Sequence, residues 1–214
     1  MSLQTAKLNW INFMRQMVGL PKMYPVKVVR NEKAKQFPLI QIKKAGDVGY
    51  DVYATESVTI PAPTPVEFQN YTRLITMYKR CLKIANNNND DEEMFQFYME
   101  KADRYHKEAM DCLPRAMIPT GIKLEMPDNI WCTVEARSSA GGRYLITPDS
   151  IIDSGYRGEF FAVVFNIGYE PQTINIGDRI CQLVFHEKTL IKPIEVDELS
   201  KSERGETGFG SSGK

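Results

Sequence analysis

The sequence predicts a mainly β domain of the sandwich or barrel type, with a helical hairpin inserted into it and a short helix before it. Short segments rich in β-branched and aromatic residues fill two blocks, residues 26–60 and 116–195. Turn residues separate these segments at close spacing, which is typical of sandwiches and barrels rather than of parallel α/β sheets. Between the blocks, residues 64–113 show helical periodicity instead.

The N-terminal extension, residues 1–24, contains a pattern typical of an amphipathic helix. Apolar residues recur at helical spacing from Leu8 to Val18, and Gly19 followed by Pro21 ends the pattern. We expect this short helix to pack on the body of the protein or on a neighbouring subunit.

The β domain is expected over residues 25–63 and 114–200. Its turn signals include Pro-Asp-Asn, Gly-Gly, Pro-Asp and Gly-Asp sequences. The segments with strand character are VKVVRN, PLIQIKK, YDVYATESVTI, MIPTGIKLEM, NIWCTVEA, EFFAVVFNIG, QTINIG and RICQLVFHE.

Residues 64–113 form the predicted hairpin. Thr64 and Glu67 have the spacing of a capping box, and the second helix is expected to start at Asp90. Because the strand pattern continues on both sides, we interpret the hairpin as an insertion into a loop of the β domain. In each arm, apolar or small residues repeat at the 3,4,3,4,3 spacing of a coiled-coil pair: Phe68, Tyr71, Ile75, Tyr78, Leu82 and Ala85, then Phe95, Tyr98, Ala102, Tyr105, Ala109 and Cys112.

The composition argues against several classes of protein. The 214 residues include 27 basic and 27 acidic side chains, so no excess of positive charge indicates binding to nucleic acid or to an anionic membrane. No apolar run approaches the roughly 20 residues that span a bilayer, and no signal-peptide core is present. We therefore expect a cytoplasmic protein. Its widely spaced cysteines predict free thiols rather than disulfides or a zinc site, and its two histidines are expected at the surface: Cys81, Cys112, Cys132, Cys181, His106 and His186.

Two internal segments carry residues suited to chemistry. ARSSAGG, residues 136–142, offers a guanidinium, two hydroxyls and backbone amides at glycines, a set that suits phosphate oxygens. SIIDSGYRGE, residues 150–159, places Asp153 directly after two apolar residues, where a carboxylate is costly unless it is hydrogen-bonded or used. From these residues alone, a catalytic Asp153 and a turn-capping Asp153 are equally good interpretations.

The C-terminal tail, residues 201–214, is rich in glycine and serine and cannot fold alone. It nevertheless contains Arg204 and Phe209, which suit phosphate binding and base stacking. Either a disordered tail or a tail that closes over a ligand fits this composition.

Five segments, taken in order, resemble the five motifs of the trimeric dUTPase family (deoxyuridine triphosphate nucleotidohydrolase). The resemblance covers residues 26–214 apart from the hairpin. It implies a distorted jelly-roll subunit, a homotrimer whose active sites lie between subunits, and hydrolysis of dUTP to dUMP and pyrophosphate. It also implies Mg²⁺ held by the triphosphate and by water, with no direct protein ligand. The five segments are DVGYDVYA, ARSSAGG, SIIDSGYRGE, GDRICQLVF and RGETGFGSSG.

The resemblance also implies roles for individual residues. Asp153 corresponds to the general base that orients the attacking water, and Tyr156 to the residue stacked under the deoxyribose. Asp51 corresponds to the first-motif aspartate, which lies behind the ligand-contacting residues or near the hydrated metal. The remaining substrate-binding positions implied are Thr147, Ile151 and Ile152 for uracil, Arg137, Ser138, Ser139 and Gln182 for phosphates, and Arg204, Phe209, Ser211 and Ser212 in the tail.

The sequence departs from the family pattern at Ala136, Ser139 and Thr207, where proline, glycine and glycine are frequent. Two alternative functions stay open at this point. The chain could be a dCTP deaminase-like or bifunctional enzyme of the same fold, although IIDSGYRGE has the hydrolase form. It could instead serve as a trimeric binding or regulatory module that uses the hairpin to contact a protein partner.

Overall fold

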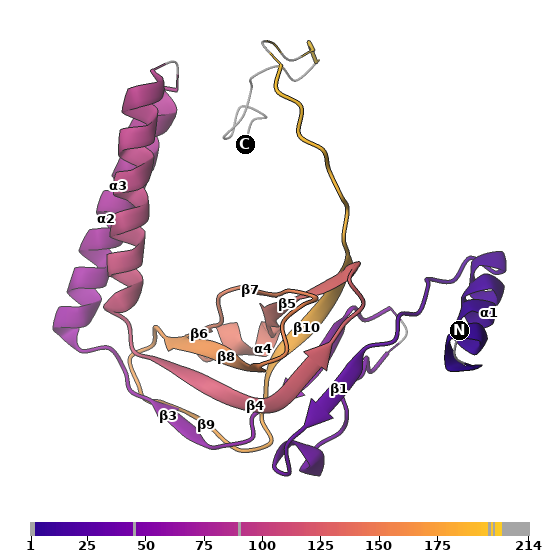
Figure 1. Cartoon of the computed structure of the whole chain (residues 1–214). Helices are drawn as coiled ribbons and strands as arrows, with labels where there is room; N and C mark the ends of the chain where they lie inside the picture. The colour runs from indigo at the N-terminus through magenta and orange to yellow at the C-terminus, as the bar shows by residue number, and fades with distance from the viewer. Residues whose placement is uncertain (1–2, 45, 90, 197, 199, 203–214) are drawn as a thin grey trace.

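The computed structural model describes residues 3–44, 46–89, 91–196, 198 and 200–202. Two antiparallel four-stranded sheets face each other, and a two-stranded sheet lies beside them (Figure 1). The predicted mainly β fold with a short first helix and a helical hairpin is therefore confirmed, although the described sheets form no closed barrel. The elements are α1 (Leu3–Met17), β1 (Lys27–Arg30), η1 (Ala34–Gln36), β2 (Gly49–Tyr53), β3 (Val58–Ile60), α2 (Pro65–Asn87), α3 (Glu92–Asp111), β4 (Arg115–Glu125), β5 (Ile130–Ala136), α4 (Ser138–Gly141), β6 (Leu145–Ile146), β7 (Ser150–Ile152), β8 (Glu159–Asn166), β9 (Gln172–Ile174) and β10 (Arg179–Glu187).

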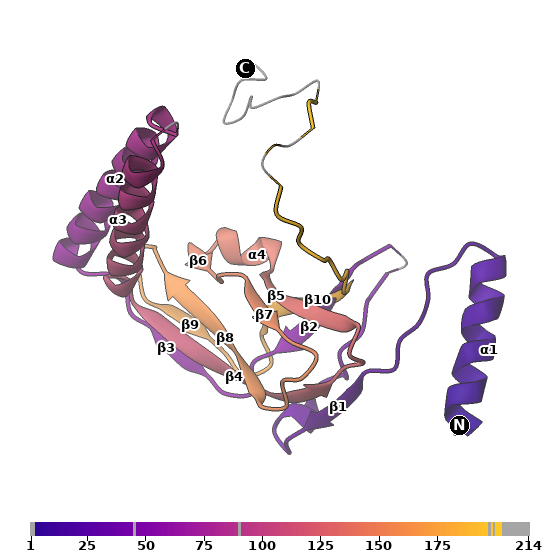
Figure 2. The ribbon, with the colours of Figure 1, turned by 45° about the horizontal axis from the view of Figure 1, so that its top comes forward.

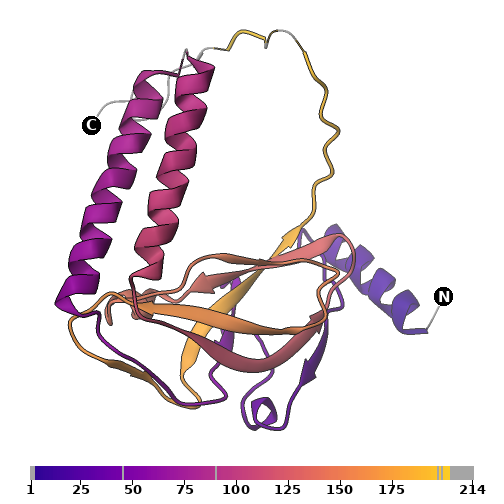
Figure 3. The same cartoon turned by 60° about the vertical axis from the view of Figure 1, so that its left-hand side comes forward.

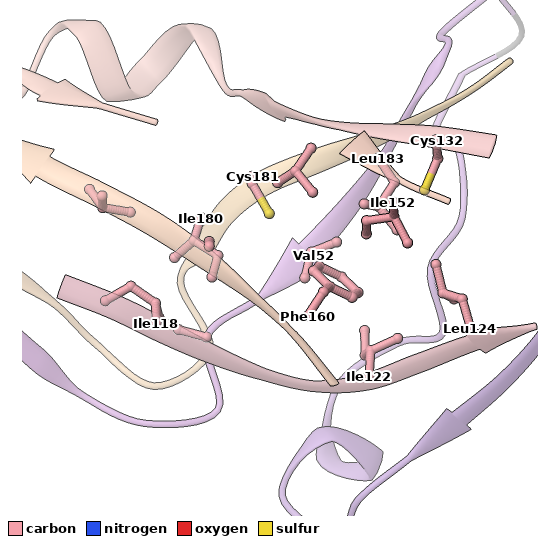
Figure 4. Packing of buried hydrophobic residues seen from close by; sticks show 14 of the residues in the cluster. Val52, Ile118, Ile122, Leu124, Cys132, Ile152, Phe160, Ile180, Cys181 and Leu183 are labelled. Atoms are coloured by element: carbon pink, nitrogen blue, oxygen red, sulfur yellow. The ribbon is translucent and has the colours of Figure 1, made fainter. Parts of the chain in front are cut away.

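The hydrophobic core fills the space between the two four-stranded sheets. Their strand orders are β1-β4-β8-β6 and β2-β10-β5-β7, while β3 pairs with β9. Successive side chains of a strand point to opposite faces, so Ile130, Cys132 and Val134 of β5 are buried and the residues between them face outward. Figure 4 shows residues of both sheets meeting in this core, among them Val52, Ile118, Ile122, Leu124, Ile152, Phe160 and Leu183.

The outward face of the second sheet carries a row of polar side chains. The strand register places Asp51 of β2 opposite Gln182 of β10, and Gln182 opposite Glu135 of β5. The three side chains therefore lie side by side on the face that points away from the core. This row is the base of the candidate site.

The hairpin stands away from the sheets as two antiparallel helices, which Figure 3 shows side by side. The predicted capping box forms, because Thr64 accepts a hydrogen bond from the amide of Glu67 and the Glu67 carboxylate accepts one from the amide of Thr64. Helix α3 is capped by Asp91, whose side chain accepts from the amide of Met94. The predicted start at Asp90 lies outside the described residues.

The contact between the two helices differs slightly from the predicted one. The predicted Ala102 and Ala109 of α3 and Ala85 of α2 are buried. The other buried residues of α2 are Leu74 and Cys81, each one position before the predicted Ile75 and Leu82. A coiled-coil spacing identifies an apolar stripe that is wider than one residue, and packing decides which edge of it is buried.

One predicted strand is absent. The segment PLIQIKK forms no strand within the described residues, and its Leu39 and Ile42 are exposed. Pro38 lacks an amide donor, and no described strand pairs with this segment. A composition that favours strands was therefore not enough to form one here. None of the described helices has the length and apolar character needed to cross a bilayer.

Candidate phosphate-binding site and the catalytic turn

Asp51 is surrounded by three cations. Its Oδ1 lies 2.9 Å from Nε of Arg137, and its Oδ2 lies 3.1 Å from both Nζ of Lys43 and Nη1 of Arg179. The side chain is 14% exposed. Burial tends to raise the pKa of Asp51, but the hydrogen bonds from Lys43 and Arg179 and the charge of Arg137 outweigh it, so the pKa is lowered below its usual value. Asp51 is therefore an ionised anchor for three basic side chains.

Arg137 connects this cluster to the short helix α4. Its Nη1 donates to the carbonyl of Arg179 over 3.4 Å and to Oγ of Ser139 over 3.5 Å. Ser138 and Ser139 begin α4, and both are exposed. Guanidinium and hydroxyl donors thus lie together at an open surface, an arrangement that can bind the oxygens of a phosphate group.

Gln182 completes this group of predicted residues. Its Nε2 donates to the carbonyl of Ala136 over 3.5 Å. A Cβ atom at Gly49 would lie 2.2 Å from Oε1 of Gln182, so the absence of a side chain at Gly49 is what leaves space for this amide. Asp51, Arg137, Ser139 and Gln182 therefore form one continuous surface.

The segment around Asp153 forms a second group. In β7, Ile151 is exposed and Ile152 is buried, and Asp153 follows in an exposed turn. The carbonyl of Asp153 accepts a hydrogen bond from the amide of Tyr156, and Nη1 of Arg157 donates to two further carbonyls of the turn. These backbone contacts fix the turn while the Asp153 carboxylate faces solvent.

Tyr156 is also held in place. Its hydroxyl donates to the carbonyl of Glu159 over 3.0 Å. The hydroxyl lies so close to Gly158 that a Cβ atom there would meet it at 2.3 Å. The ring is 46% exposed, so one part of it packs on glycine and the rest is available to a ligand.

Thr147 lies at the opposite end of the turn from Asp153. It is buried, and its Oγ1 has no hydrogen-bond partner among the described residues. With Ser139 and Arg179 it lines a small cavity of about 40 Å³. The start of the predicted uracil turn is therefore in contact with the predicted phosphate-binding helix.

The two groups lie far apart within one chain. Cys132 of β5 pairs with Ile152 of β7, so Asp153 lies beside Trp131. Arg137 follows Trp131 by six residues of extended chain, which corresponds to about 20 Å at roughly 3.3 Å per residue. One copy of the chain therefore places Asp153 and Arg137 at separate ends of β5.

Lys43 and Arg179 were not predicted as site residues from the sequence. Arg179 lies three residues before Gln182, so its position in the fourth motif was an available signal. The carboxyl pair of Glu135 and Asp149 was not predicted either. A hydrogen bond to the Glu135 carboxylate, together with the negative charge of Glu135, raises the pKa of Asp149. The tail residues Arg204, Phe209, Ser211 and Ser212 lie outside the described residues.

The donor set bears on metal binding. No cluster of three or more metal-ligating side chains occurs in the described part of the chain. Asp51, the carboxylate nearest to the basic cluster, is already paired with three cations. These residues fit a divalent cation that arrives on the oxygens of a phosphorylated ligand better than an ion enclosed by protein ligands.

Comparison with known proteins gives a consistent result. A family model for dUTPase matches residues 108–213. The deoxyuridine 5'-triphosphate nucleotidohydrolase of Caldanaerobacter subterraneus is 42% identical over 100 residues, covering 45% of this chain and 68% of that protein. The enzyme of the same name from Clostridium kluyveri is 43% identical over 106 residues, covering 47% of this chain and 73% of that protein.

Two solved structures share the fold. The dUTPase of Staphylococcus bacteriophage 80alpha with dUPNHPP has a TM-score of 0.60 at 19% identity, covering 90% of this chain and all of that one. The dUTPase of phage phi11 of S. aureus has a TM-score of 0.54 at 16% identity, covering 83% and 99%.

Proposed function

Because this chain belongs to the dUTPase family, we propose that it hydrolyses dUTP to dUMP and pyrophosphate by attack of water on the α-phosphorus. The observation that carries the proposal is the presence, inside the matched region, of both the phosphate-binding surface at Arg137 and the exposed carboxylate of Asp153.

Asp153 is the proposed general base. A carboxylate can accept a proton from water while it orients that water for attack. The turn that carries Asp153 is held by a backbone hydrogen bond and by the Arg157 side chain, which supports a fixed backbone position for the base. Tyr156 would stack under the deoxyribose, and backbone groups of the turn around Thr147, Ile151 and Ile152 would bind the uracil edge.

The phosphates would bind at Arg137, Ser138, Ser139 and Gln182. Asp51 would act through Arg137, because it holds the guanidinium against β2 and does not itself face a ligand. Mg²⁺ would enter with the triphosphate and neutralise part of its charge. The tail would contribute Arg204, Ser211 and Ser212 to the phosphates and Phe209 to the uracil ring.

We infer that the active protein is a homotrimer with shared sites. Residues that bind the triphosphate and activate water must reach the same α-phosphorus, yet about 20 Å of strand separates their positions in one chain. Sites between copies remove this conflict, since Arg137 of one copy can meet Asp153 of another.

The alternatives predicted from sequence are less well supported. The two relatives described above are named as nucleotidohydrolases rather than deaminases. The prediction of a protein partner at the hairpin stays a prediction, as does a cytoplasmic location.

A nucleotide panel tests the proposed reaction. Purified protein with Mg²⁺ should release pyrophosphate from dUTP and not from dCTP, dTTP or UTP, whereas ammonia release from dCTP would contradict the proposal. Asp153→Asn should lower kcat by about 100-fold or more and leave nucleotide binding intact. Asp128→Asn, which changes an exposed turn aspartate elsewhere, is the matched control.

A further inference from the structure

Helix α1 presents an apolar stripe that its own chain does not cover. Trp10, Phe13 and Met17 are 63%, 59% and 69% exposed, and Met14 is exposed beside them. Their spacing of i, i+3, i+4 and i+7 places all four on one helix face. Among the described residues, no helix or strand packs extensively against α1. A 15-residue helix is marginally stable alone in water, so the stripe requires a partner surface.

Hydrogen bonds to the segment that follows α1 hold the helix in a fixed orientation. The chain turns back after Gly19, and the side chain of Asn12 exchanges two hydrogen bonds with the backbone of Met23. Nε of Arg15 donates to the carbonyl of Pro21 over 2.7 Å. Tyr24 then packs against the core and contacts Glu187 through its hydroxyl.

Figures 1 and 2 both show α1 set apart from the sheets, including β4 and β8. The helix is therefore directed away from the outer faces of β4 and β8 in its own chain.

A complementary surface lies on the outside of β4 and β8. A groove of about 530 Å³ has an apolar floor, in which Met117 is 62% exposed and Pro119 pairs across the sheet with Phe161. Three carboxylates and one ammonium group line it: Glu32, Glu56, Glu159 and Lys33.

The charges of the helix and the groove are opposite. Residues 1–31 contain no aspartate or glutamate, and α1 with the segment that folds back on it carries Lys7, Arg15 and Lys22. Of the three groove carboxylates, Glu32 pairs with Lys35 and Glu56 pairs with Lys33, so the groove keeps an excess of one negative charge, at Glu159. An amphipathic helix with anchors at this spacing is the kind of ligand that apolar grooves accept.

We propose that α1 of one copy docks in the groove on the outer face of β4 and β8 of a neighbouring copy. Helix and groove are different surfaces, so the contact is heterologous and repeats from copy to copy until a ring closes. Each copy then donates one helix and receives one. The proposal rests on surface complementarity and not on the proposed hydrolysis of dUTP.

Disulfide trapping tests the docking directly. In a Cys112→Ser background, the other cysteines are buried, so new thiols dominate the exposed chemistry. Two differently tagged chains, one with Met14→Cys and the other with Met117→Cys, are co-expressed and oxidised. The expected result is a disulfide-linked pair containing one chain of each kind, because only Cα atoms within about 7 Å can be bridged.

Two controls make the result decisive. Met14→Cys combined with Val66→Cys, a hairpin site whose side chain is 65% exposed against 62% for Met117, should give no linked pair. Adding Trp10→Ser and Phe13→Ser to the Met14→Cys chain should weaken docking by about 30-fold or more and reduce linking accordingly. Absence of the mixed pair, or a disulfide found only when both cysteines share one chain, would overturn the proposal. Both readouts are independent of nucleotide turnover.

Discussion

At the scale of single residues, Asp51 is held by cations from three parts of the chain. Lys43 comes from a loop, Arg137 from the end of β5 and Arg179 from the start of β10. Replacing the carboxylate would leave three like charges close together without a counterion. The structural role of Asp51 is therefore to permit this concentration of positive charge beside α4.

Asp51→Asn should lower the free energy of unfolding by about 1–3 kcal/mol near neutral pH, because the cluster is only partly shielded from water. The pKa of Asp51 is lower in the folded chain than in the unfolded chain. Its stabilisation is thus fully present above the unfolded pKa of about 3.9 and is lost as pH falls through the folded pKa. Urea unfolding at neutral and at acidic pH should show a difference that shrinks in acid. An unchanged difference would contradict this account.

The second prediction for a single residue concerns the buried side chain of Asn166. Its fully buried Nδ2 donates to the carbonyls of Ile60, Pro61 and Glu170, and its Oδ1 accepts from the amide of Gly168. Asn166→Ala would leave these buried backbone groups unpaired and should cost about 2–4 kcal/mol. Thermal and urea unfolding would measure this loss, and Asn87→Ala at an exposed helix end should have little effect. Equal stability of the two variants would refute it.

The sequence predicts individual residues to different degrees. Arg137 and Asp153 could be located because each lies in a distinctive segment, whereas Gln182 was predicted only through the family resemblance. Lys43 became a site residue only because the fold brings it to Asp51. Arg179 lies in the fourth motif, but only the fold shows that it pairs with Asp51. The buried hydroxyl of Thr147, which has no hydrogen-bond partner among the described residues, could not be predicted either. Its burial depends on the positions of β6 and α4.

At the scale of elements, local chemistry predicts the helices better than the small strands. The capping box of α2 and the spacing in α3 specify their helices without help from the rest of the chain. By contrast, β6 and β7 have two and three residues and exist because β8 and β5 offer hydrogen bonds to them. PLIQIKK shows the converse, because it has strand composition but no described partner strand.

The prediction at the scale of elements concerns removal of the hairpin. Its buried side chains pack between α2 and α3 rather than into the β core. Replacing residues 65–113 with a short glycine linker should therefore leave dUTP hydrolysis largely intact. Pyrophosphate release and the thermal transition of the shortened chain would be measured together. Loss of turnover in a chain that still folds would show that the hairpin contributes to the site.

At the scale of the whole molecule, the proposed site requires residues from more than one chain. Sequence order identifies the motifs, but it contains no register, so the separation of Asp153 from Arg137 could not be predicted from it. The separation follows from the antiparallel pairing of β5 with β7. It is the property of the single chain that most strongly favours assembly.

Mixing inactive variants tests shared sites. Arg137→Gln and Asp153→Asn should each be nearly inactive, whereas trimers re-formed from an equal mixture should regain about a quarter of wild-type turnover, since one site in each mixed trimer contains both native residues. Arg137→Gln mixed with Gln182→Ala should regain nothing, because both changes fall in the same group of residues. Turnover that stays at the level of the separate variants would rule out sites shared in this way.

The buried contacts of Asn166 have a consequence for how such chains diversify. They satisfy the carbonyls of Ile60 and Pro61, just before the hairpin begins, so the end of β3 has its hydrogen bonds without any contribution from the hairpin. Selection on the enzyme then places little constraint on the length or sequence of the inserted segment. Lineages with this fold are free to exchange one insert for another, and we expect variation to concentrate at residues 65–113 while the asparagine is retained.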